Sequence, residues 1–185
     1  YALAHEGGLG KTELWYILEA DEGAQICYGF SRPITNEEMR RRIEDNTLLA
    51  VLNQIPVKKG DVFLIEAGTI HAIGKGILLA EIQQNSNTTY RVYDYDRRDG
   101  YGNLRELHIE NALDVTDTSN VPSIPLVSAY VQEDGYTKSC LTTCKYFTVF
   151  DLKIASHADL CCGIKSFQSL LFLSGSARIF FLDAA

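Results

Sequence analysis

The sequence predicts a mainly β fold, an antiparallel sandwich or barrel of the jelly-roll type with a small helical insertion. Two features indicate this class. Short apolar segments of strand length recur along the chain, and turns containing Gly and Asp separate them. A helical pattern interrupts this series at about 33–55. The composition, 46% hydrophobic and 22% charged over 185 residues, is that of an ordinary globular protein.

The first expected elements form a β-hairpin. Lys11–Ala20 has the two-residue period of a strand, which places four side chains on one face: Lys11, Glu13, Trp15 and Ile17. A turn at 21–23 then leads to a second strand at 24–30. Residues 32–57 carry the helical pattern, in which Thr35 or Asn36 can cap the first helix and a second, short helix ends at Leu52.

Further strands are expected beyond the helical insertion. They lie at Val62–Ile65, Ile77–Gln83 and Tyr90–Tyr95, and a short helix follows at Glu106–Val115. The division of the chain is therefore a first β domain at 1–118, a linker at 119–127 and a second β-rich part at 128–185. In this last part, strands are expected at 146–154 and 167–183.

The charge pattern excludes some classes of function. The net charge is −7 and no run of basic residues follows a groove, which argues against nucleic-acid binding. The cluster Arg40–Arg42 is followed by acidic residues, as on a solvated helix face. No apolar stretch approaches the roughly 18 residues of a membrane span. We therefore expect no nucleic-acid partner and no membrane partner.

The cysteines indicate free thiols. There are five, an odd number, and Cys161 and Cys162 are adjacent, an arrangement that rarely forms a disulfide. Cys140 and Cys144 lack the matching second pair of a zinc site. Free buried thiols indicate a reducing compartment, so we expect a cytoplasmic protein.

Several charged residues stand in expected strands, each open to two interpretations. Lys11 and Glu13 form either a structural pair at an exposed strand end or a pair at the mouth of the barrel that binds something, since burying them alone costs several kcal/mol. Glu81 is either an edge or bulge charge or a proton carrier. Arg91, on one face with Tyr93 and Tyr95, is either stacked on the surface or part of an anion site.

His71 follows a strand and the turn at Gly68, and it is either a satisfied lone histidine or a ligand. Glu13 and His71 are ligands of the kind that zinc takes. Lys11 and Arg91 bind anions. A metal beside a cationic pocket suits a phosphorylated small molecule as the partner.

Two sets of motifs carry a resemblance to known families. The pattern G-x5-E-x-G-x2-H from Gly60 to His71 resembles the second cupin motif, which ends in a metal-ligating histidine, although Glu66 stands where that motif has proline. The strings "GGLGKTELWYIL", "KKGDVFLIEAGTIHAIGKGILLAEIQQNSNTTYRVYDYDR" and "ELHIENALDV" resemble the type I mannose-6-phosphate isomerases in their short bacterial form. The resemblance is good over roughly Tyr1 to Val115 and loose beyond it.

The resemblance implies a cupin-like domain with one zinc ion held by a glutamine, a glutamate and two histidines. Glu13 and His71 match two of these ligands. The Gln-x-His pair is absent and is expected upstream of Tyr1. The 185 residues are therefore interpreted as an internal fragment that binds zinc weakly and is inactive as an isomerase. The same resemblance places Lys11, Glu81 and Arg91 around a sugar phosphate.

The implied activity is the interconversion of mannose 6-phosphate and fructose 6-phosphate by a monomer. A proton leaves C2 of the aldose to give a cis-enediol and returns at C1, with zinc and Arg91 stabilising the negative charge. Glu81 is one candidate base. Two alternatives stay open: a non-catalytic cupin that binds sugar or regulates, and an iron-dependent cupin oxygenase, which usually needs more histidines than this chain places together.

Overall fold

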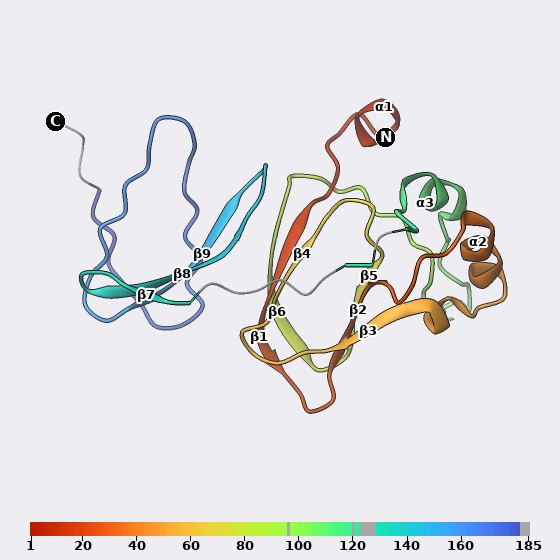
Figure 1. Cartoon of the computed structure of the whole chain (residues 1–185), viewed down its shortest axis with the longest axis horizontal. Coiled ribbons are helices and arrows are strands. Elements are labelled where there is room, and N and C mark those ends of the chain that lie inside the picture. Colours follow the sequence, from red (N-terminus) through yellow and green to blue (C-terminus); the bar gives the residue numbers. More distant parts are fainter. Residues whose placement is uncertain (96, 120, 123–128, 182–185) are drawn as a thin grey trace.

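The computed structural model describes residues 1–95, 97–119, 121–122 and 129–181. Within these residues, nine strands form three antiparallel sheets of three strands each (Figure 1). The prediction of a mainly β fold with a small helical insertion is confirmed. Among the described residues, no helix is long and apolar enough to cross a membrane.

The first two sheets face each other around a shared core. The order in one is β4 (Val62–Ile65), β1 (Glu13–Ala20) and β6 (Ile77–Gln83). The order in the other is β3 (Leu52–Pro56), β2 (Gln25–Phe30) and β5 (His71–Ile73). Side chains from both sheets form one buried cluster that includes Trp15, Ile17, Ile26, Tyr28, Ile55, Phe63 and Ile65.

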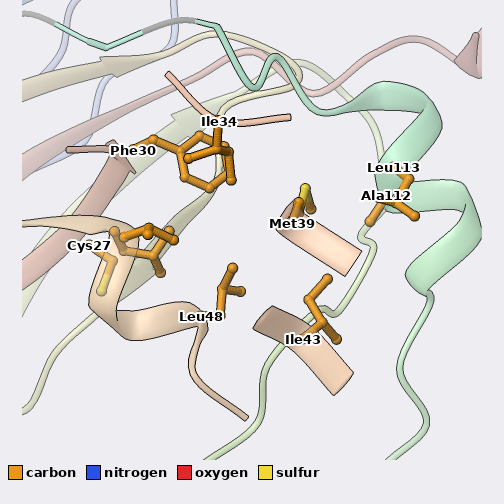
Figure 2. Close-up of a cluster of buried hydrophobic side chains, with 10 residues drawn as sticks. Cys27, Phe30, Ile34, Met39, Ile43, Leu48, Ala112 and Leu113 are labelled. Carbon is orange, nitrogen blue, oxygen red and sulfur yellow. The ribbon is translucent and has the colours of Figure 1, made fainter. Parts of the chain in front are cut away.

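The helical insertion packs as a separate unit against the second sheet. The helix α2 (Asn36–Glu44) is capped by Thr35, whose hydroxyl accepts a hydrogen bond from the Glu38 N–H at 3.1 Å. Its buried residues Met39 and Ile43 meet Phe30 of β2, the short 3₁₀ helix Leu48–Val51 and helix α3 (Ile109–Val115) (Figure 2). A further short helix, α1 (Ala2–His5), precedes β1.

The third sheet covers the outer face of the first one. It consists of β7 (Val131–Gln132), β8 (Tyr136–Thr143) and β9 (Thr148–Ile154). Leu141 of β8 packs against Leu14 and Val62. Because side chains alternate along β1, Leu14 and Tyr16 point to this sheet while Glu13, Trp15 and Ile17 point into the core. The predicted linker 119–127 lies mostly outside the described residues.

Three predicted elements are wrong in part. The expected strand Tyr90–Tyr95 is irregular, because its backbone bonds to a loop: the Arg91 N–H donates to His108 Nδ1 at 3.0 Å and the His108 N–H to the Arg91 carbonyl at 2.7 Å. The end of the helical segment 32–57 is strand β3, which pairs with β2. The described part of 167–183 contains no strand, since no described segment pairs with it.

The turn before β5 requires glycine at position 68. Gly68 has φ +95°, and a Cβ added there would lie 2.7 Å from the carbonyl oxygen of Val115 at the end of α3. Gly60 has the similar φ of +92°, but a Cβ added there would meet nothing within 4 Å. A side chain at either position would strain the backbone, but only at position 68 would it also collide with neighbouring atoms.

Replacing these glycines by alanine tests that distinction. Both variants pay a strain of about 1–3 kcal/mol in the free energy of unfolding. We expect Gly68→Ala to lose about 1–2 kcal/mol more than Gly60→Ala, because the new methyl group collides with backbone. Urea denaturation measures both values, and equal losses would contradict the close approach of this turn to α3.

Candidate functional site

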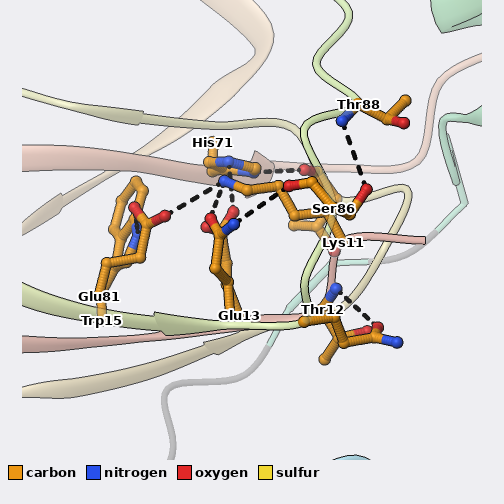
Figure 3. A network of polar contacts seen from close by, with 11 residues as sticks. Lys11, Thr12, Glu13, Trp15, His71, Glu81, Ser86 and Thr88 are labelled. Carbon is orange, nitrogen blue, oxygen red and sulfur yellow. Dashed lines mark hydrogen bonds and ion pairs between the residues drawn. The ribbon is translucent and has the colours of Figure 1, made fainter. Parts of the chain in front are cut away.

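A fully buried carboxylate lies at the centre of the candidate site. Glu13 is the first residue of β1 and its side chain is 0% exposed. Its Oε2 accepts a hydrogen bond from Lys11 Nζ at 2.7 Å, and its Oε1 lies 2.9 Å from His71 Nε2 (Figure 3). Burial disfavours the charged form, but the contacts with His71 and Lys11 outweigh it and lower the pKa of Glu13 from 4.5 to about 2.

His71 presents its Nε2 atom to this carboxylate. The residue begins β5, directly after the turn at Gly68, and its Nδ1 lies 2.8 Å from the carbonyl oxygen of Thr69. A carbonyl oxygen can only accept, so Nδ1 carries the ring proton and Nε2 of the neutral imidazole has a free lone pair. His71 Nε2 lies within ion-pair distance of Glu13 Oε1. This buried oxygen nevertheless has no hydrogen-bond partner with suitable geometry.

Two lone-pair atoms at this distance repel each other unless a positive charge lies between them. A second ring proton supplies that charge, and so does a metal cation bound to both atoms. The carboxylate oxygen and the imidazole nitrogen are ligands that zinc takes. The pair therefore fits part of a metal site.

Lys11 connects Glu13 to a second carboxylate. Its Nζ lies 3.3 Å from Glu81 Oε1 on β6, and the other oxygen of Glu81 accepts a hydrogen bond from Trp15 Nε1 at 3.1 Å. Partial burial works against the charge on Lys11, but the two carboxylates together raise its pKa. The side chains of Lys11 and Glu81 are 22% and 32% exposed, so this end of the network is in partial contact with solvent.

The structure thus brings together four of the five predicted site residues: Lys11, Glu13, His71 and Glu81. The fifth, Arg91, makes its contacts elsewhere. Its Nη1 donates to the Glu106 carbonyl at 3.1 Å and its Nε lies 3.9 Å from Asp94 Oδ1. No described contact joins it to Lys11 or His71, because the strand expected to carry it does not form.

The ion pairs around Arg91 form a group of their own. Asp94 Oδ1 also lies 2.5 Å from Arg97 and 3.4 Å from Arg105. These pairs lower the pKa of the Asp94 carboxyl, first through the hydrogen bond from Arg97. The Tyr95 ring meets the Tyr93 ring edge to face, and the guanidinium group of Arg97 lies 5.9 Å from the centre of the Tyr95 ring. Two hollows of the described chain, one beside Cys27 and one between α2 and α3, contain none of the five predicted site residues.

The sequence did not lead us to expect a polar segment after β6 that hydrogen-bonds to the backbone just before β1. Gln84 and Thr12 exchange two hydrogen bonds of 3.0 Å, from Thr12 N–H to Gln84 Oε1 and from Gln84 N–H to the Thr12 carbonyl. Ser86 Oγ donates to the Leu9 carbonyl at 2.8 Å. These bonds fix the residues on either side of Thr12, which are Lys11 and Glu13. The polar run "QQNSNT" at the end of the expected strand Ile77–Gln83 could have indicated this hydrogen-bonded segment.

No group of three or more His, Cys, Asp or Glu side chains in the described part of the chain lies close enough to hold a metal. The five cysteines are free, as predicted, but only Cys27 is buried. Cys140 and Cys144 form no metal site with other described residues.

Comparisons with known proteins show which proteins the chain is similar to. No protein-family model matches the chain. It is 46% identical to the mannose-6-phosphate isomerase of Streptococcus mutans and 45% identical to ManA, the mannose-6-phosphate isomerase of Bacillus subtilis, each over 86% of this chain. The solved structure of the Bacillus subtilis mannose 6-phosphate isomerase matches with a TM-score of 0.76 and 38% identity, over 83% of this chain and 49% of that one.

The chain therefore has the cupin-like β fold of this class of sugar-phosphate isomerases. The similarities support the mannose-6-phosphate isomerase family for it. The chain spans about half the length of the curated relatives it matches.

Glu13→Gln tests the charge balance of the site. We expect it to lower the free energy of unfolding at pH 7 by about 1–3 kcal/mol, since Lys11 loses a charged partner. The lowered pKa of Glu13 contributes stability above pH 4.5 that is lost as the pH falls towards 2. The acid side of the stability curve should therefore be flatter in the variant. Urea denaturation across this range measures it, and parallel curves would contradict the assignment.

Proposed function

We propose that the protein is an aldose–ketose isomerase that interconverts mannose 6-phosphate and fructose 6-phosphate at a zinc site. The observation that carries the proposal is the contact of 2.9 Å between the fully buried Glu13 carboxylate and the partly exposed His71 ring, where a metal cation bound to both atoms would supply the missing positive charge. This pair of residues occurs in a chain that is 46% and 45% identical in sequence to two proteins named mannose-6-phosphate isomerase. The partner is a small sugar phosphate, bound by a monomer.

Glu13 and His71 would hold the zinc ion through Oε1 and Nε2. When bound, zinc supplies a Lewis acid that stabilises negative charge on substrate oxygens. A catalytic zinc site keeps three protein ligands and one open position. Water, substrate or further protein groups would complete the coordination, because the described residues offer two ligands. The free cysteines support a reducing, cytoplasmic location.

The reaction moves a proton from C2 of the aldose to C1, through a cis-enediol. Lys11 stays charged at neutral pH, because its two carboxylate partners raise its pKa, and it is placed to bind the phosphate or the hydroxyls. Glu81 is the proposed proton carrier. Its contact with Lys11, at 3.3 Å, is longer than a good ionic hydrogen bond and is the one that a substrate hydroxyl would replace.

Arg91 is proposed to stabilise the charge of the enediolate or the phosphate. Support for this role comes from the resemblance in sequence, since its described contacts are with Asp94 and Glu106. The second candidate function is a non-catalytic sugar-binding module. The small number of described ligands favours it, because a cation held by two side chains would be bound weakly.

The test measures mannose 6-phosphate conversion in a coupled assay and zinc content by elemental analysis, on the complete gene product. We expect stoichiometric zinc and turnover. His71→Asn should lose zinc and lower kcat/KM by more than about 100-fold, since even residues that only support metal ligands are worth about 10–100-fold.

His157→Asn is the matched control, because His157 is exposed and lies away from the network; its activity should equal that of the wild-type protein. Full turnover in His71→Asn would contradict the zinc site. Sugar-phosphate binding without turnover would establish the binding module instead. The same measurements on the 185 residues alone test the expectation of weak zinc binding and no activity.

A further inference from the structure

We propose that Trp15 is a positioning residue that fixes His71 and Glu81 relative to each other. The inference rests on the proposed function, in which these two residues serve as a metal ligand and a proton carrier. Trp15 is the only tryptophan in the sequence. Its indole group contacts both side chains at once, and neither the resemblance nor the alternation of the strand assigns it more than a place in the core.

The contact with Glu81 follows from the register of two strands. Trp15 on β1 pairs directly with Glu81 on β6, so both side chains stand on the same face of the first sheet. The indole N–H donates to Glu81 Oε2 at 3.1 Å. This bond leaves Oε1 as the oxygen that faces Lys11. The indole therefore determines which way the carboxylate turns.

The contact with His71 orients the imidazole ring. The two rings meet edge to face, with centroids 5.2 Å apart and an interplanar angle of 82°. The Thr69 carbonyl holds the ring at Nδ1. Held on these two sides, the imidazole directs Nε2 to the carboxylate of Glu13.

The burial of Trp15 shows that it acts through its neighbours. Its side chain is 2% exposed and belongs to the core cluster between the two sheets, with Tyr28 and Phe63 among its members. A substrate held at the exposed edge of the network does not reach it. A rigid, packed indole with its N–H satisfied is suited to hold polar groups at fixed positions.

Loss of the indole N–H has a defined consequence. Oε2 of Glu81 would lack its donor, and the carboxylate would turn to share the ammonium group of Lys11 more fully. Lys11 would then move away from Glu13, whose Oε2 it contacts at 2.7 Å. One missing hydrogen bond would thus displace the proton carrier and the substrate-binding cation together.

The decisive variant is Trp15→Phe, which keeps an aromatic ring and removes the donor. In the complete gene product we expect kcat to fall by about 10- to 100-fold, the range for residues that support a metal site, while KM changes by less than about 3-fold. Combined with Glu81→Ala, the same change should lower kcat by less than about 3-fold further, because phenylalanine keeps the ring beside His71 and the loss of the N–H acts through Glu81. Effects that simply multiply would overturn the proposal.

Ile17→Val is the matched control, since Ile17 is fully buried on the same face of β1 and its side chain has no polar atom. It should lower the unfolding midpoint and leave kcat unchanged. A second readout does not depend on activity: nitrogen-15 spectra of the His71 ring in the metal-free protein. They should change in Trp15→Leu, which also removes the ring that contacts His71, and not in Ile17→Val.

The outcomes separate the two proposals. If no form of the protein isomerises mannose 6-phosphate, the proposed function fails, and the His71 spectra alone decide the role of Trp15. An unchanged His71 spectrum in Trp15→Leu, or an unchanged kcat of Trp15→Phe in an active protein, would show that Trp15 only fills the core.

Discussion

The burial of the Glu13 carboxylate is the constraint on which the rest of the site depends. A lone charge in this position would cost several kcal/mol, so the surrounding residues must supply compensation. Lys11 does so at Oε2. His71 Nε2 lies 2.9 Å from Oε1, and a contact this short between the two atoms requires a proton or a metal ion between them. The charged edge formed by Lys11 and Glu81 is the partly exposed part of this network, where the proposed function places the substrate.

The site joins the two sheets of the sandwich. Glu13 and Glu81 belong to the first sheet, and His71 begins a strand of the second. Their meeting therefore requires the complete packing of Trp15, Phe63 and the rest of the shared core. The helical insertion packs against the second sheet and contributes none of these groups, while the third sheet covers the outer face of the first.

Local periodicity predicted the strands, and the family resemblance grouped the charged residues into one site. The two-residue period placed Lys11, Glu13 and Trp15 on one face. The glycine turn was expected to leave His71 at the end of a strand, whereas in the structure His71 begins β5. The predictions that failed concern segments whose structure depends on pairing with residues distant in the sequence. Tyr90–Tyr95 has a strand-like sequence but bonds to a loop through His108, so Arg91 lies with Asp94. Likewise, strand β3 follows from pairing with β2, which no local pattern reveals.

Zinc-edge anomalous diffraction from crystals of the complete gene product tests the central claim most directly. The account predicts a single zinc peak about 2.0–2.2 Å from both a carboxylate oxygen of Glu13 and Nε2 of His71. In that structure the two side chains would no longer contact each other directly. Zinc bound elsewhere in an active protein, with Glu13 and His71 still in direct contact, would contradict the account.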